Sequence, residues 1–163
     1  MNSRNIAYNV QANRIFLITL VISVVALLIS FSVDLSGMHS CRLCKLQRIP
    51  YFLIILSSLY GIFCDSKAIC FYFLAAISAI NIIMACYHLG IQQGLFIDPC
   101  LINHPTNKEA LKQMLFEHSI PCSKVTLSIA GLPMSAWNCA ASMVCLGIPT
   151  KFLIIQKRLC NKL

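Results

Sequence analysis

Charged residues are scarce in this chain of 163 residues: they make up 11% of it, against roughly 25% in an average soluble domain. Acidic residues are the scarcest, with 5 against 13 basic ones. Apolar residues reach 58%, and the mean hydropathy is +0.77. A soluble domain of ~150 residues leaves roughly a third of its chain surface in water, so it could not hide this much apolar surface. The composition therefore excludes a soluble or disordered chain and predicts one compact membrane domain.

Glycine and proline, with six residues each, are too few for a collagen-like chain. The net charge of +8 would suggest nucleic-acid binding in a soluble protein. Here the basic residues mostly flank apolar runs, which is the pattern of membrane anchoring. We therefore expect contacts with membrane lipid and no nucleic-acid partner.

Four apolar runs are long enough to cross a bilayer, whose hydrocarbon core is about 30 Å thick. The expected spans are residues 15–33, 45–63, 68–89 and 133–155. The first could instead be a cleaved signal peptide, although its uncharged run is longer than such a segment needs. The last contains Gly147, Pro149 and Lys151, which we expect to interrupt it near its end. The sequence thus predicts an all-α integral membrane protein, a four-helix bundle forming a single domain over residues 1–163.

Four spans place both termini on one side of the membrane. Lys and Arg number seven on that side and six on the other, but three of those six lie in the long loop of residues 90–132. Charges away from the span ends carry little weight, so we expect the termini inside and the loops 34–44 and 90–132 outside. The other three lie in the short outer loop or at the start of the span that follows it, where topology alone does not explain them: Arg42, Lys45 and Arg48.

The ten cysteines are sorted by the expected spans. The outer loops hold four of them: Cys41, Cys44, Cys100 and Cys122. An even number of cysteines in an oxidising compartment indicates disulfides. The other six lie in the spans or on the inner side, where thiols fill apolar space or stay reduced: Cys64, Cys70, Cys86, Cys139, Cys145 and Cys160. Of these, Cys86 and Cys139 lie near outer helix ends.

Cys41 and Cys44 form a C-x-x-C pair, a spacing that permits either an easily reduced disulfide or part of a zinc site. The neighbouring basic residues would repel a divalent cation, so we expect no metal. The same positive charge lowers the pKa of a thiol and suits a reactive thiolate. If a helix runs through this stretch, Cys44 and Arg48 share a face at i, i+4. The alternative for Arg48 is simple anchoring at the membrane interface.

The outer loop of residues 90–132 carries the second pair, Cys100 and Cys122. Between them, residues 106–109 (TNKE) read as a helix capping box followed by apolar residues on one face. This predicts a short amphipathic helix that lies on the membrane surface or packs on the bundle. A disulfide across this loop could have a purely structural role. A charge-activated pair on the same side indicates instead that the two dithiols exchange.

Residues 41–51 (CRLCKLQRIPY) resemble the signature of the disulfide bond formation protein B (DsbB) family, in which C-x-x-C is followed four residues on by Arg. Residues 87–94 (YHLGIQQG) are similar to the end of that family's third span. Pro99-Cys100 is similar to the family's third cysteine site, and residues 131–137 (GLPMSAW) to the opening of its fourth span. The matches follow in order along the whole chain, with a short gap between the third and fourth cysteines.

The resemblance implies an oxidoreductase that reoxidises a periplasmic, DsbA-like thioredoxin-fold protein and passes two electrons to a membrane quinone, either ubiquinone or menaquinone. It also implies a place in the bacterial inner membrane, with cytoplasmic termini and periplasmic catalytic loops. Cys100 would form the mixed disulfide with the partner, and Cys122 is its pair. Cys41 would accept electrons from the loop pair, and Cys44 would contact the quinone as a thiolate.

Two further residues would bind the cofactor if the resemblance holds. Arg48 would stabilise the Cys44 thiolate and the negative charge that develops on the quinone. His88, at the outer end of the third span, is expected as a quinone neighbour or proton donor.

Two other functions remain open. A vitamin K epoxide reductase-like enzyme also combines four spans, a C-x-x-C pair and a quinone, but it usually carries the pair late in the bundle. A non-enzymatic four-span protein with structural disulfides would have no need of three basic residues beside C-x-x-C. A mild dithiol reductant should reduce a catalytic Cys41–Cys44 disulfide, whereas a purely structural disulfide should resist reduction.

Overall fold

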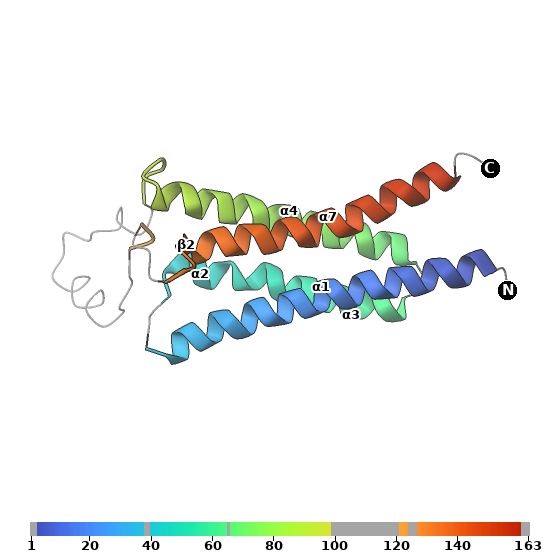
Figure 1. Ribbon diagram of the computed structural model, residues 1–163, viewed down its shortest axis with the longest axis horizontal. Helices are drawn as coiled ribbons and strands as arrows, with labels where there is room; N and C mark the ends of the chain where they lie inside the picture. The colour runs from blue at the N-terminus through green and yellow to red at the C-terminus, as the bar shows by residue number, and fades with distance from the viewer. Residues whose placement is uncertain (1–2, 38–39, 65, 99–120, 124–126, 161–163) are drawn as a thin grey trace, which may run out of the picture.

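Four long helices form the body of the protein in the computed structural model, which describes residues 3–37, 40–64, 66–98, 121–123 and 127–160 (Figure 1). In chain order the elements are α1 (Ser3–Leu35), α2 (Arg42–Leu46), α3 (Arg48–Phe63), α4 (Lys67–Gln92), β1 (Ser128–Ile129), β2 (Leu132–Pro133) and α7 (Met134–Cys160). Within these residues, four helical segments are long and apolar enough to cross a membrane. The predicted all-α membrane fold is confirmed.

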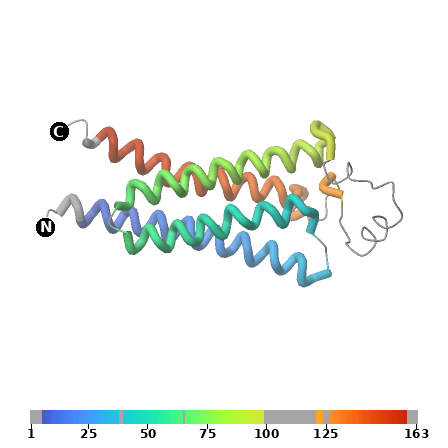
Figure 2. Tube along the Cα trace, turned by 180° about the vertical axis from the view of Figure 1, so that it is seen from behind, coloured from blue at the N-terminus to red at the C-terminus, as the bar shows by residue number. Residues whose placement is uncertain are grey.

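The bundle consists of two helix pairs, α1 with α3 and α4 with α7 (Figures 1 and 2). The beginning of α1 and the end of α7 lie at the same end of the bundle, as an even number of spans requires. The opposite end carries α2 and the antiparallel β1–β2 hairpin. We call this the outer end of the bundle, following the expected topology.

The helices extend further than the predicted spans. The segments that could cross a membrane are Ile6–Leu35, Arg42–Phe63, Lys67–Gln92 and Met134–Arg158. The predicted limits followed the uncharged runs, but a helix can continue through the interfacial layer, where charged side chains reach water. The end of α1, the beginning of α2 and the end of α4 therefore lie within the stretches expected as outer loops, 34–44 and 90–132. The expected amphipathic helix and Cys100 lie outside the described residues.

The expected interruption of the last span is wrong, because α7 continues through Pro149 without a break. Proline lacks the N–H that would bond to the carbonyl one turn back. The next residue adds hydrogen bonds in the same turn, because the Thr150 hydroxyl donates to the carbonyls of Leu146, at 2.7 Å, and Gly147, at 3.1 Å. Such local hydrogen bonds allow proline inside membrane helices.

The main apolar core lies towards the end of the bundle where α1 begins. Phe16 and Phe71 stack there with ring centroids 4.3 Å apart, and Phe152 packs against them from α7. Gly61 on α3 makes the packing possible, since a Cβ there would lie 2.6 Å from the Phe16 ring. The outer end is packed differently, around sulfur and polar side chains.

Candidate functional site

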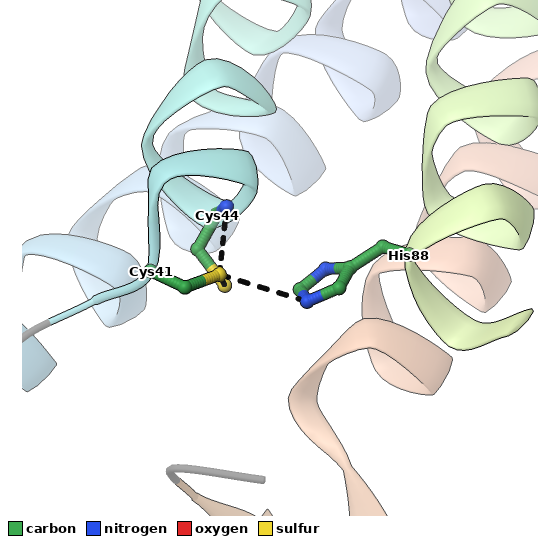
Figure 3. Close-up of side chains that lie close together, drawn as sticks. All are labelled: Cys41, Cys44 and His88. Carbon is green, nitrogen blue, oxygen red and sulfur yellow. Dashed lines mark hydrogen bonds between the residues drawn. The ribbon is translucent and has the colours of Figure 1, made fainter. Parts of the chain in front are cut away.

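The C-x-x-C pair lies at the beginning of α2, facing α4 (Figure 3). Cys41 is the N-cap of α2, and its Sγ accepts the backbone N–H of Cys44 at 3.3 Å. The two thiols are reduced and hydrogen-bonded, with their sulfurs 3.0 Å apart. His88 reaches the pair from α4, with its Nε2 3.6 Å from Cys41 Sγ. Cys41 and His88 are both almost fully buried.

These contacts favour a thiolate on Cys41. The hydrogen bond with the Cys44 thiol lowers the pKa of Cys41 most; burial opposes this, while His88 and the Cys44 N–H lower it further, to about 4. When Cys41 is ionised, Cys44 is the donor between the two sulfurs and keeps its proton. A thiolate on Cys44, as the resemblance implies, therefore requires Cys41 to be held in a disulfide with another residue.

Replacing His88 by Leu should raise the pKa of Cys41, because the imidazole is one of the groups that stabilises its thiolate. In the reduced parent, the thiolate ultraviolet absorbance should disappear as the pH falls through about 4. In H88L the same signal should disappear at a higher pH. Loss of the signal in C41S assigns it to this sulfur, and an unchanged midpoint in H88L would show that His88 does not act on Cys41.

Cys122 belongs to the same site although it is far from Cys41 in sequence. Both are buried in one cluster with Ile91, and Leu43 and Cys44 pack against it. Cys122 is disulfide-bonded. Next to it, the N–H of Ser123 donates to the Asp98 carboxylate at 2.8 Å. This hydrogen bond connects the Cys122 segment to the residues that follow α4. Three of the four predicted site cysteines thus come together, and the fourth lies outside the described residues.

Arg48, in the first turn of α3, points towards the outer end of α1. Its Nη2 forms an ion pair with Asp34 Oδ2 at 2.6 Å and also donates to Ser40 Oγ at 3.2 Å. Its Nε donates to Ser30 Oγ at 2.8 Å, and its guanidinium carbon lies 4.7 Å from the centre of the Phe31 ring. The side chain is only 12% exposed. Simple anchoring in lipid headgroups does not explain a guanidinium held by this many protein groups.

A cavity of about 490 Å³ lies beside Arg48, between α1, α3 and α7. Side chains of α1, such as Val21, Val25 and Ile29, make much of its wall apolar. Cys44 and Arg48 both line it, although Gln47 separates α2 from α3. Small-molecule sites typically have volumes of roughly 300–1,000 Å³ and apolar walls with a few placed polar groups. This cavity fits that description.

Two amides that the sequence analysis missed also line this cavity, Gln47 and Asn138. Asn138 Nδ2 donates to Gln47 Oε1 at 2.9 Å, and Gln47 Nε2 donates to the Met84 carbonyl at 3.2 Å. The Tyr51 hydroxyl donates to the Asn138 side chain. Each amide nitrogen carries two N–H donors, and these bonds engage one of each. The only sequence signal was an amide side chain near the outer end of an apolar run.

His88 does not line this larger cavity. It lines a smaller one of about 50 Å³ together with Cys44, Gln92 and Ser135. Gln92 Nε2 lies 3.5 Å from His88 Nε2, and the Ser135 hydroxyl donates to Gln92 Oε1. His88 Nδ1 is buried without a hydrogen-bond partner among the described residues. Cys44 therefore lies between two cavities, and His88 contacts the thiol pair from the smaller one.

The chain was compared with protein families, curated proteins and solved structures. The model of one family, described as disulfide bond formation protein DsbB, matches residues 12–150. No curated protein and no solved structure matches. The matched region contains most of the chain and every residue of the site described above. The chain therefore belongs to the disulfide bond formation protein DsbB family, whose members are helical membrane oxidoreductases that form disulfide bonds.

Proposed function

We propose that this protein oxidises the dithiol of a periplasmic, DsbA-like thioredoxin-fold partner and passes the electrons to a membrane quinone. One observation carries the proposal: Cys41 and the disulfide-bonded Cys122 are buried in one cluster, and Cys44 connects that cluster to the large cavity. Thiol–disulfide exchange requires sulfurs that can meet, and reduction of a quinone requires a donor at its binding site. This arrangement suits both.

The exchange begins with the oxidised protein. A thiolate of the partner attacks Cys100, which breaks its bond to Cys122 and releases Cys122 as a thiolate. Cys122 attacks Cys41, which breaks the Cys41–Cys44 bond and releases Cys44 as a thiolate. The second thiol of the partner then resolves the mixed disulfide and frees Cys100. Cys100 re-forms its bond with Cys122, so two electrons and two protons have moved from the partner to the Cys41–Cys44 pair.

The large cavity is the proposed quinone site. Its apolar wall suits the ring and the start of an isoprenoid tail, and Arg48, Gln47 and Asn138 offer donors for ring oxygens. When bound, the quinone supplies the oxidising power by accepting two electrons and two protons. Cys44 lines this cavity, so it is the sulfur that faces the acceptor.

Arg48 and His88 act on opposite sides of the thiol pair. The guanidinium keeps its charge in a poorly solvated site and stabilises negative charge at the cavity edge. Asp34, Ser30 and Ser40 fix its position there. His88, beside Cys41, stabilises the thiolate of that residue in the reduced pair.

The outer end of the bundle should be periplasmic. Labelling of two cysteines at opposite ends of one helical segment tests this. Cys44 and Cys64 are both partly exposed and lie at opposite ends of the α2–α3 segment. After mild reduction of intact cells, a membrane-impermeant maleimide should label Cys44 and leave Cys64 unlabelled until the membrane is permeabilised. Labelling of Cys64 with protection of Cys44 would reverse the proposed orientation.

Cys41 and Cys122 are buried in one cluster, which predicts a disulfide between them that can be trapped. In the double variant C44A/C100A, Cys41 and Cys122 have lost their usual partners and should oxidise together, yielding a cross-linked peptide in a non-reducing digest. The matched control C41A/C100A leaves Cys44 and Cys122, and should give markedly less of the corresponding cross-link. Equal yields, or none in either variant, would mean that electrons do not pass through Cys41.

A further inference from the structure

Two cysteines outside the active site lie against each other between α4 and α7. The sulfurs of Cys86 and Cys139 are 3.7 Å apart. They are on the helix pair with the most extensive contact among the described residues, and neither has a part in the proposed exchange. Two thiols in contact on neighbouring helices can be joined by a disulfide if small rotations bring the sulfurs to about 2.05 Å.

Both residues lie close to the outer ends of their helices. Cys86 is six residues before the last residue of α4, and Cys139 is five residues after the first residue of α7. At 1.5 Å per residue these positions are only about 7–9 Å from the helix ends. The middle of a hydrocarbon core of about 30 Å lies deeper than this in helices that extend past the bilayer, so the pair is near the outer interface.

The two thiols differ in access. Cys86 is exposed on the side of α4, whereas Cys139 is 7% exposed and covered by the bundle. A disulfide in the outer interface can therefore reach Cys86 first, and Cys139 is placed to resolve the product. This combination of an accessible and a buried thiol is what intramolecular exchange needs.

We propose that Cys86 and Cys139 form a second redox-active pair, which closes to a disulfide between α4 and α7. This rests on the orientation given under the proposed function, which places the outer end in an oxidising compartment. Cys86, as a thiolate, attacks a small disulfide RSSR and forms a mixed disulfide with release of RSH. Cys139 then attacks Cys86, forms the interhelical bond and releases the second RSH. The pair loses two electrons and two protons, and both are carried away in the two thiols.

The closed pair braces the helices that form the site. His88 and Gln92 follow Cys86 on α4, while Ser135 and Asn138 precede Cys139 on α7. The Ser135–Gln92 hydrogen bond already joins the outer ends of the same two helices. A disulfide between Cys86 and Cys139 would hold α4 and α7 at a constant distance. His88 and Gln92 of α4 line the smaller cavity, and Asn138 of α7 lines the larger one, so the disulfide would fix the two cavities relative to each other.

The test uses the full-length protein in membrane vesicles, treated with dithiodipyridine, a lipid-permeable aromatic disulfide. Free thiols are then alkylated, the protein is digested without reduction, and the peptides are identified by mass spectrometry. We expect a cross-linked peptide that contains Cys86 and Cys139. The cross-link should be absent from C86S and C139S, and it should persist in C145S, which removes a buried thiol on the same helix as Cys139.

If Cys86 and Cys139 are alkylated separately after this treatment, the proposal of a second redox-active pair is wrong, and the two residues are only thiols packed against each other. The experiment includes neither a partner protein nor turnover, so its result does not depend on catalysis. A cross-link in a protein that fails to reduce quinone would count against the proposed function alone. A protein that reduces quinone but gives no cross-link would count against the second pair alone.

Discussion

Replacing Cys44 by Ala should reduce quinone-dependent turnover by at least about a thousandfold, as expected when a residue that exchanges covalent bonds is removed. Without Cys44, Cys41 has no second sulfur with which to form the disulfide that gives the electrons up to the quinone. The Cys100–Cys122 bond is still available to the partner, so the first attack should continue. Quinone absorbance measures turnover, and a non-reducing gel measures the mixed disulfide with the partner.

The comparison with C100A separates the two ends of the relay. C100A should abolish the mixed disulfide with the partner, whereas C44A should still form it. C145A, which removes a buried thiol of α7 that lines neither cavity, should turn over like the parent. Normal partner oxidation by C100A, or by C44A, would show that the relay runs through other residues.

Replacing Arg48 by Met should slow quinone reduction by up to about a hundredfold while leaving the partner's attack on Cys100 unchanged. A charge about 6 Å away at an effective dielectric constant of ~20 contributes about 3 kcal/mol, and each ~1.4 kcal/mol changes a rate tenfold. The ion pair with Asp34 offsets part of the positive charge, so the loss should lie between about ten- and a hundredfold. Turnover at several quinone concentrations separates an effect on quinone affinity from one on the maximal rate.

Two variants control for loss of charge and loss of structure. R48K keeps a positive charge but cannot reproduce the fork of donors to Ser30, Ser40 and Asp34, so it should fall between the parent and R48M. R42M removes an exposed charge from the first position of α2 and should have little effect. Equal kinetics for R48M, R48K and the parent would show that Arg48 has no part in quinone reduction and only anchors the helix at the membrane interface.

Local spacing was enough to predict part of the site. C-x-x-C followed by Arg four residues on predicted that Cys44 and Arg48 share a face if one helix carries both. The two residues lie on separate helices, α2 and α3, and both line the large cavity. The spans were predictable from apolar runs, and the order of the elements followed from them. The limits of the helices were not, since the interfacial layer tolerates helix that the hydrocarbon core would reject.

Contacts between distant segments could not be predicted from the sequence. Asp34 follows the first apolar run, and nothing in the sequence indicated that it would hold Arg48 in place. His88 was expected beside the quinone, and its contact with Cys41 depends on how α4 is turned against α2. The break expected at Pro149 did not occur, since a membrane helix can continue through proline, and the Thr150 hydroxyl adds hydrogen bonds to two carbonyls of the same turn.

The most direct test of the proposed function is the coupling between partner oxidation and quinone reduction. Purified protein is mixed with an excess of a reduced DsbA-like thioredoxin-fold protein and a short-chain quinone, and both products are quantified over time. We expect one quinone to be reduced for each partner disulfide formed, with repeated turnover of both reactions lost in C44A. Partner oxidation that proceeds without quinone loss, or quinone loss that persists in C44A, would contradict the relay from Cys100 through Cys41 and Cys44.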